Sequence, residues 1–497
     1  MRPLCSLLLM LIALAGCGRD TRITVEHRLP QIYPDYTSIV IPYNIAPLNF
    51  TVQEEGERFK AVIRSEAGTP VTISNRTSVI RIPIRRWKKL LADNKEKTLY
   101  MDLYVKRHGT WTRFDAVENH ISEDPIDPYL TYRLIEPGYV NYGEISLQER
   151  NLENFNTRIL VSNQRDVVHG GDFCINCHTP RERNAAYTVF HVRGKLGGTV
   201  ITTPEQAVKV NMKTDSTFSA AVYPAWHPVK NRIAFSINST GQLFHTTDLQ
   251  KVEVFDTRSD LVMYDTDRHT ITPICQTDDR LETFPAWSPD GKYLYYCSAP
   301  CPPRDEAGNL SIPDVYQQFY YDLIRRPYDA EADTFGRAEI MVLASSAHLS
   351  VSFPRLSPDG RFLLFCLSEY GTFSIWHKSS DLYMIDLQEN KLKRLEAVNS
   401  PETESYHAWS SNSRWIVVSS RRENGNYTRP YIAYIRPDGQ ETKAFLLPQR
   451  DPSRYPLLLK SFNVPEFMTG PAVHARRKYD DVIHLDAIQA TYKPLSR

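Results

Sequence analysis

Short runs in which apolar and polar residues alternate follow one another along most of the chain, separated by turn residues. In 99–106, for example, positions 99, 101, 103 and 105 are all apolar. An alternation of period two predicts half-buried β-strands. In the first quarter of the chain only 87–95 (WKKLLADNK) has the spacing of a short amphipathic helix. The pattern therefore predicts an all-β protein, and 28 Tyr and 33 Pro agree with a chain rich in strands and turns.

Four stretches repeat one pattern: an aromatic residue, a Pro or small residue, a Trp or Leu, a polar turn and a strand. They are YPAWHPVKNRIAFS from Tyr223, FPAWSPDGKYLYYCS from Phe284, FPRLSPDGRFLLFCL from Phe353 and YHAWSSNSRWIVVSS from Tyr406. A second repeated segment, SDLVMYD at 259–265 and SDLYMID at 380–386, adds a further hairpin to the period. Four strands in each repeat predict a β-propeller of about five to seven blades.

The equivalent Trp residues of these repeats are expected to pack the blades rather than to bind a ligand. They are Trp226, Trp287 and Trp409, and Leu356 takes their place in one repeat. The segment 187–202, with its Gly-Gly turn, is expected to begin the first blade, and 461–467 either to close the ring or to lie over it.

The remaining segments lack this repeat. Residues 17–130 contain several strand patterns without a common period, which predicts a β-sandwich-like domain. Residues 131–183 are rich in charge and Asn and are predicted to be a connector, followed by the propeller at 184–470 and a tail at 471–497.

The first residues, MRPLCSLLLMLIALAGC, have the pattern of a secretory signal. Arg2 precedes an apolar run at 7–14 that is too short to span a bilayer. The run ends in Leu-Ala-Gly-Cys, which resembles the bacterial lipobox, so 1–16 are predicted to be a lipoprotein signal peptide and Cys17 the lipid attachment site. The alternative is an ordinary signal peptide in which Cys17 has no role. Either way the protein is expected in the cell envelope, anchored on its periplasmic or outer-membrane side if Cys17 carries lipid.

The stretch GGDFCINCHTP at 170–180 contains Cys174, Cys177 and His178 in the order C-x-x-C-H. This order is typical of covalent haem c attachment, in which two thiols bind the porphyrin and the following His binds iron. A Cys174–Cys177 disulfide and a zinc site that includes His169 remain as alternatives. A thioredoxin-like site is disfavoured, because no βαβ pattern surrounds the motif.

His178 is predicted to be one axial ligand of the iron. His191 is the first choice for the second, because it lies in a nearby predicted strand. The alternative for His191 is a half-buried strand residue with a hydrogen-bonded ring. Four further residues remain open as the second ligand: His169, His227, His407 and Met468.

Several classes of function lack support in the sequence. There is no G-x-S-x-G, phosphate loop or dinucleotide fingerprint. A net charge of +1 gives no reason to expect nucleic acid as a partner.

Three stretches, CINCH, PAWSPDGKYLYY and HAWSSNSRWIVVSSRR, carry a resemblance that covers most of the chain. The chain resembles TolB-like, WD40-like β-propeller lipoproteins with a single c-type haem motif. The first hypothesis is an exported, lipid-anchored protein that transfers electrons through one covalently bound haem to an envelope or redox partner. One alternative is an envelope scaffold whose propeller binds protein and whose cysteines are structural. A haem enzyme with an open iron position is a third hypothesis.

Overall fold

The computed structural model describes residues 23–136, 143–165, 173–247, 250–301, 315–474 and 476–494. The predicted signal peptide, Cys17 and His169 lie outside these ranges. Within them, no helix is long and apolar enough to cross a membrane.

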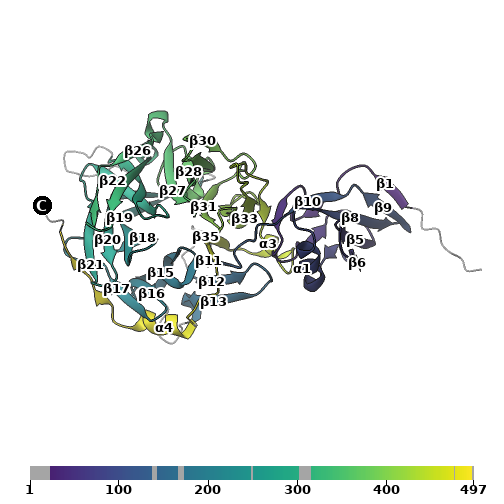
Figure 1. Ribbon diagram of the computed structural model, residues 1–497, viewed down its shortest axis with the longest axis horizontal. Helices are drawn as coiled ribbons and strands as arrows, with labels where there is room; N and C mark the ends of the chain where they lie inside the picture. Colours follow the sequence, from purple (N-terminus) through teal and green to yellow (C-terminus); the bar gives the residue numbers. More distant parts are fainter. Residues whose placement is uncertain are drawn as a thin grey trace, which may run out of the picture.

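The N-terminal residues form a β domain that lies to one side of the rest of the molecule (Figure 1). A seven-stranded sheet and a three-stranded sheet build it together with one helix, α1. Trp87 of α1 is fully buried, and its indole N–H donates to the carbonyl oxygen of Ile45 at 2.9 Å. The elements are β1 (Ile23–Glu26), β2 (Ile32–Tyr33), β3 (Val40–Pro42), β4 (Phe50–Val52), β5 (Arg58–Arg64), β6 (Val71–Asn75), β7 (Val79–Ile80), α1 (Ile84–Ala92), β8 (Thr98–Arg107), β9 (Thr110–Phe114) and β10 (Val117–Ser122).

Six further sheets are present in the described part of the chain, and they surround a common axis as blades of a β-propeller (Figure 1). The innermost strands β35, β14, β18, β22, β27 and β31 contact one another in this order, and β31 contacts β35 again, so the ring is closed. The all-β prediction is therefore confirmed, and six lies within the predicted range of blade number.

The first three blades use strands from both ends of the chain. Blade 1 consists of β35 (Ser461–Met468), β11 (Tyr129–Ile135), β12 (Ile145–Asn151) and β13 (Thr157–Ser162). Blade 2 consists of β14 (Phe173–Arg181), β15 (Asn184–Gly194), β16 (Gly198–Thr202), β17 (Ala207–Asn211) and β36 (Ile488–Gln489). Blade 3 consists of β18 (Ala221–Trp226), β19 (Arg232–Phe244), β20 (Val252–Asp265), β21 (Thr270–Cys275) and β37 (Thr491–Tyr492).

The other three blades are continuous in sequence. Blade 4 consists of β22 (Arg280–Trp287), β23 (Tyr293–Pro300), β24 (Asp322–Asp329), β25 (Thr334–Phe335) and β26 (Glu339–Val342). Blade 5 consists of β27 (Ser350–Leu356), β28 (Phe362–Ser368), β29 (Asp381–Asp386) and β30 (Lys391–Arg394). Blade 6 consists of β31 (Glu404–Trp409), β32 (Trp415–Ser420), β33 (Arg429–Tyr434) and β34 (Phe445–Leu446). Helices α3 (Arg454–Leu457) and α4 (Arg476–His484) and the 3₁₀ turns η1 (Asn163–Arg165), η3 (Tyr316–Gln318), η4 (Ala344–Ala347) and η5 (Ser374–Trp376) complete the described elements.

The structure corrects the predicted connector and tail. Residues 131–183 contain strands of blades 1 and 2 instead of a connector, and the propeller therefore begins near Tyr129 rather than at 184. Charged residues suggested a loop there, but they are bonded within the fold: Arg150, for example, donates to Gln449 Oε1 at 2.9 Å and to the Pro448 carbonyl at 2.7 Å. The segment 471–497 is not a loose tail, because β36 and β37 extend blades 2 and 3 as parallel edge strands.

Three of the four repeated turns, which begin at Ser288, Ser357 and Ser410, share one hydrogen-bond pattern that explains their sequence. The Ser hydroxyl at the start of the turn donates to the Asp or Asn two residues later, at 2.6 Å for Ser288–Asp290 and for Ser410–Asn412. That Asp or Asn in turn accepts a backbone N–H two residues further on, which fixes the turn into the next strand.

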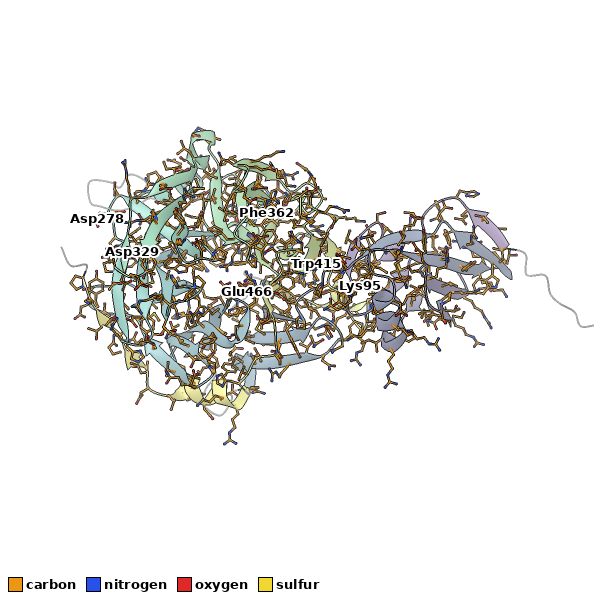
Figure 2. The ribbon with its side chains drawn as sticks, in the orientation of Figure 1. Lys95, Asp278, Asp329, Phe362, Trp415 and Glu466 are labelled. Atoms are coloured by element: carbon orange, nitrogen blue, oxygen red, sulfur yellow. The ribbon has the colours of Figure 1, made fainter. Side chains whose placement is uncertain are left out.

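The N-terminal domain docks on blade 6. The indole N–H of Trp415 donates to the Asp124 carbonyl at 3.2 Å, and the Tyr434 hydroxyl donates to the Asp124 carboxylate at 2.6 Å. Figure 2 places Trp415 at the junction of the two domains. The axis of the propeller is accordingly separate from this contact.

Candidate functional site

A β-bulge lies in the innermost strand of every blade and shapes the centre of the propeller. The register of β14, β18, β22, β27 and β31 shifts by one residue against the next strand, and β35 is bulged against β11. Five equivalent residues take positive φ there: Cys177 (51°), Tyr223 (49°), Phe284 (54°), Phe353 (54°) and Val464 (50°). A bulge changes the direction of a side chain, and here it turns one residue of each blade toward the axis.

Three of these five residues are aromatic, and Tyr406, at the bulge of β31, is the aromatic residue at the equivalent place in the sixth blade. The four rings stack around the centre. The ring centroids of Tyr223 and Phe284 are 4.5 Å apart, those of Phe284 and Phe353 are 4.5 Å apart, and those of Phe353 and Tyr406 are 4.2 Å apart. Cys177 and Val464 occupy the two remaining positions of the circle. Aromatic side chains therefore surround the axis in four blades, and the smaller side chains of the other two blades leave more space there.

An axial cavity of about 320 Å³ opens beside this aromatic row. Its volume is at the lower end of the range found for small-molecule sites, which is roughly 300–1,000 Å³. Its wall combines Cys174, Cys177 and His178 with aromatic residues and with three arginines, Arg133, Arg193 and Arg355. All three residues of the C-x-x-C-H motif thus reach one cavity.

The bulge explains how both thiols reach the same cavity. Residues three apart in a regular strand point to opposite faces. Because the register shifts between Asn176 and Thr179, Cys177 takes a left-handed conformation, and Cys174 and Cys177 both line the cavity. Both thiols are free and half-buried, which does not support the predicted alternative of a Cys174–Cys177 disulfide.

The His178 side chain is only 2% exposed, and neither of its ring nitrogens has a hydrogen-bond partner. Burial, together with the nearby Arg133 guanidinium, lowers the pKa of His178 to about 3. The imidazole is therefore neutral at physiological pH, which is the form that binds a metal ion. A buried polar ring without partners is costly, so a ligand that bonds to this ring would offset that cost.

His191 does not share this position. Its Nδ1 lies 3.2 Å from the Thr199 hydroxyl oxygen, and its ring is buried but is not part of the cavity wall. Of the other residues considered as second ligands, His227, His407 and Met468 are likewise outside the described cavity wall. The structure thus brings together three of the four predicted haem-site residues. His191 instead matches the alternative considered for it, a strand histidine whose ring is hydrogen-bonded.

The three cavity arginines were not predicted from the sequence. Arg133 is 8% exposed; its guanidinium donates to the Ile175 carbonyl at 2.9 Å, to Asn176 Oδ1, and to Asn463 Oδ1 at 2.6 Å. No local pattern marks Arg133 as a site residue, since its partner Asn463 is 330 positions away.

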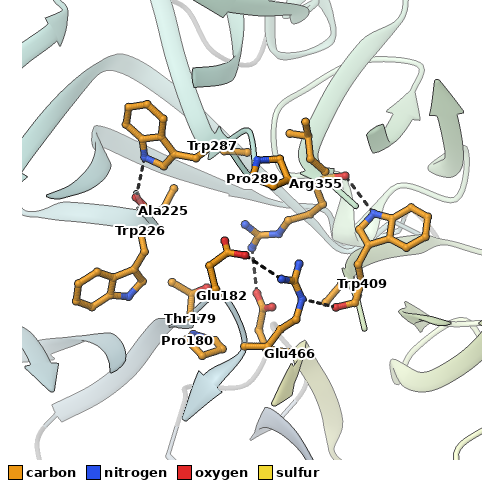
Figure 3. A pocket seen from close by; sticks show the side chains of 14 residues that line it. Thr179, Pro180, Glu182, Ala225, Trp226, Trp287, Pro289, Arg355, Trp409 and Glu466 are labelled. Carbon is orange, nitrogen blue, oxygen red and sulfur yellow. Dashed lines mark hydrogen bonds and ion pairs between the residues drawn. The ribbon is translucent and has the colours of Figure 1, made fainter. Parts of the chain in front are cut away.

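A second, smaller cavity of about 90 Å³ lies at the other end of the innermost strands (Figure 3). Arg355 lines both cavities, and its guanidinium lies 3.1 Å from the Glu466 carboxylate. Burial raises the pKa of Glu466, and Arg355 opposes this effect. The ion pair therefore lies on the axis between the two cavities.

Trp226, Trp287 and Trp409 line this second cavity but mainly join blades. The Trp287 indole N–H donates to the Ala225 carbonyl of the preceding blade at 3.2 Å, and that of Trp409 donates to the Arg355 carbonyl at 3.3 Å (Figure 3). These bonds agree with the packing role expected for the repeated Trp.

The cavity residues fit a c-type haem better than a bare metal ion. Among the described residues, no three His, Cys, Asp or Glu side chains are close enough to hold one metal ion. The zinc alternative includes His169, which lies outside the described residues. Two free thiols, an unpartnered neutral imidazole and an aromatic wall are the groups that haem attachment requires.

No family model matches the chain, and no curated protein sequence does either. Among solved structures, the chain is similar to prolyl oligopeptidase B from Galerina marginata, with 9% identity over 70% of this chain and 42% of that one and a TM-score of 0.34. It is also similar to the tricorn protease, with 11% identity over 82% of this chain and 43% of that one and a TM-score of 0.35. A third similar structure is the Cps50 (Swd1) β-propeller domain of Myceliophteria thermophila, with 11% identity over 55% of this chain and 85% of that one and a TM-score of 0.28. The chain spans less than half the length of the first two proteins. At these identities and TM-scores the similarities carry no argument about function.

Proposed function

We propose that this protein is a lipid-anchored, c-type cytochrome-like β-propeller of the cell envelope that transfers electrons through one covalently bound haem. The observation that supports it is the convergence of Cys174, Cys177 and His178 on the axial cavity. The motif occurs where the propeller repeat has an aromatic residue in four other blades, so the fold itself does not require a thiol there.

Covalent attachment is a balanced addition that this site permits. Each thiol S–H adds across one vinyl C=C of the porphyrin: sulfur bonds to one carbon and hydrogen to the other. No atom leaves and no oxidant is needed, but the thiols must be reduced, as Cys174 and Cys177 are here.

When bound, the haem supplies an iron that accepts and releases one electron. His178 would bind the iron through a ring nitrogen, and its imidazole is already neutral. The aromatic row of Tyr223, Phe284, Phe353 and Tyr406 would exclude water from one side of the site. Burial and axial ligation of this kind set the reduction potential.

The second axial position distinguishes electron transfer from catalysis on a small oxidant. The described cavity wall contains His178 but no second His and no Met. A low-spin spectrum that becomes high-spin in His191→Ala would require the His191 ring to leave Thr199 and would support the predicted ligand. A high-spin spectrum in the wild-type protein would favour a haem enzyme with an open iron position.

The test is to export the full chain together with a c-type maturation system, and then to stain for haem on a denaturing gel and measure the intact mass. The proposal expects one covalent haem in the wild type and its loss in Cys174→Ala and Cys177→Ala. Cys275→Ala is the matched control, because Cys275 is a half-buried free cysteine outside the axial cavity. If the mature wild type carries no haem, the envelope scaffold hypothesis replaces this one.

The lipid anchor is a separate part of the proposal. Cys17→Ser should move the protein from the membrane fraction to the soluble fraction or leave the precursor uncleaved. Unchanged membrane association would reject acylation of Cys17 without affecting the haem argument.

A further inference from the structure

The described wall of the axial cavity contains three arginines and no acidic residue. The arginines are Arg133, Arg193 and Arg355. Arg355 has a counter-ion, because it pairs with Glu466. No carboxylate among the described residues lies within 4.0 Å of Arg133 or Arg193.

Of these two residues, Arg133 gives the stronger indication of an anionic ligand, because its charge is buried. All its acceptors are neutral, and its Nε has no partner at all. An ionised group that is removed from water without a counter-ion is costly, so a fold retains one where something pairs with it. Buried Arg429 differs, since four main-chain carbonyl oxygens accept its hydrogen bonds and it does not line the cavity.

Asp256, an acidic neighbour of Arg193, does not form an ion pair with it. Asp256 is not part of the cavity wall and accepts hydrogen bonds from Asn238 at 2.6 Å and from Thr240 at 2.7 Å. Arg193 itself is exposed at the cavity wall, opposite Cys174 in the β14–β15 pair. A ligand attached to the thiols would therefore lie close to two guanidinium groups.

From this arrangement we propose that Arg133 and Arg193 form a carboxylate-binding element of the axial cavity. Its ligand is a flat apolar molecule that bears carboxylates: the apolar body lies against the aromatic row and the carboxylates bind the arginines. Guanidinium groups bind carboxylates strongly through charge-assisted, often bidentate hydrogen bonds. The identity of this ligand as a porphyrin, with its propionates at the arginines, rests on the proposed function.

The experiment uses the purified full chain made without haem maturation. Protoporphyrin IX and its dimethyl ester are titrated in parallel, and binding is followed by quenching of tryptophan fluorescence, since Trp376 lines the cavity. The two probes share the same ring and differ only in their carboxylates. The wild type is expected to bind the free acid about ten-fold or more tightly than the ester, as one or two charge-assisted hydrogen bonds provide.

Arg133→Gln and Arg193→Gln should each reduce this preference several-fold, whereas Arg258→Gln, at an exposed arginine outside the cavity wall, should leave it unchanged. Arg193 is on the surface, so its variant remains informative even if Arg133→Gln does not fold. Equal affinity of the wild type for acid and ester, or an unchanged preference in Arg193→Gln, would overturn the proposal. A wild type that prefers the acid yet acquires no covalent haem during maturation would sustain this inference while the proposed function fails.

Discussion

Cys177 and Tyr223 occupy equivalent positions in neighbouring blades, each at the bulge of an innermost strand and each with a left-handed φ, 51° and 49°. Their strands, β14 and β18, contact each other directly. Phe284, Phe353 and Tyr406 hold the same position in the next three blades. Cys177 therefore replaces an aromatic residue within a structural repeat. The fold does not require a thiol at this position, so the presence of the thiol must have another explanation.

The first prediction is that Cys177→Phe restores the repeat without harming the protein. The aromatic ring would enter the axial cavity rather than a filled core, so the overpacking cost of about 1–3 kcal/mol should largely be avoided. We expect a free energy of unfolding within about 1 kcal/mol of wild type, measured by urea denaturation, together with complete loss of covalent haem.

Cys177→Ala serves as the control that removes the thiol without filling the cavity. An aggregated Cys177→Phe protein beside a well-folded Cys177→Ala would show that the two positions are not equivalent, because the cavity could not then accept an aromatic ring.

The equivalence of Cys177 and Tyr223 also shows where sequence reasoning stopped. The repeats from Tyr223 onward could be predicted, because aromatic, Pro and Trp residues recur together with the same Ser-x-Asp or Ser-x-Asn turn. CHTP at 177–180 is the same element, but Cys replaces the aromatic residue and Thr-Pro replaces Ala-Trp, so no pattern connects it to the other blades. The sequence therefore revealed the C-x-x-C-H motif through its chemistry but not its place in blade 2, and the motif was predicted to lie in a connector.

Blade 1 and the cavity arginines could not be predicted for a different reason. β11 pairs with β35, which is more than 320 positions later in the chain, and local alternation does not specify such a partner. Arg133 enters the cavity wall only because this pairing places it beside Asn463. The charged residues of 131–183 indicated a solvent-exposed connector, whereas in the structure several of them are hydrogen-bonded inside the propeller.

The second prediction concerns the limits of the propeller. A fragment 184–470, which corresponds to the domain predicted from sequence, lacks β11 and β14 and would leave β35 without the strand that it pairs with. Unpaired strand edges favour aggregation, so this fragment should be insoluble or unfolded. A fragment 129–494 retains the described strands of all six blades and should be monomeric and β-rich by gel filtration and circular dichroism.

The comparison of the two fragments is decisive because they share blades 4 to 6 and the strands β18 to β21 of blade 3. A soluble, cooperatively folding 184–470 fragment would mean that ring closure by β11 and β35 is dispensable. Trp415 and Tyr434 lose their Asp124 contacts in both fragments, so loss of the N-terminal domain cannot account for a difference.

The third prediction tests the ion pair on the axis. Glu466→Gln removes the counter-ion of Arg355 while preserving the shape of the side chain. Loss of one partner of a fully buried pair costs about 3–5 kcal/mol, but Arg355 is 29% exposed, which lowers the expected destabilisation to about 1–2 kcal/mol. A double-mutant cycle with Arg355→Met, measured by urea denaturation, should give a coupling energy of similar size. Additive effects of the two substitutions would mean that the pair contributes nothing to stability.

The fourth prediction is that His407 makes the fold sensitive to acid. His407 is 2% exposed, with its Nδ1 3.0 Å from the Ser405 carbonyl oxygen and its Nε2 without a partner. Burial lowers the pKa of His407 from its usual 6.5 to about 4. Between these two values the unfolded chain binds more protons than the folded one, so stability is lost as pH falls through this window. The slope contributed by His407 approaches about 1.4 kcal/mol per pH unit.

His407→Gln cannot take up this proton, so its advantage should emerge only in acid. We expect the difference in free energy of unfolding between wild type and variant to be constant above pH 7 and to shift by about 2–3 kcal/mol in favour of the variant by pH 4.5. Comparing the two proteins removes the opposing effect of Glu282 and Asp256, whose pKa values burial raises to about 7 and about 6. The stability that those two carboxyls contribute to the fold is lost as pH rises, which is the opposite of the effect of His407. Both carboxyls are present in the wild type and in the variant, so their effect cancels in the comparison. Parallel stability profiles from pH 8 to pH 4.5 would therefore mean that His407 is protonated as readily in the folded chain as in the unfolded one.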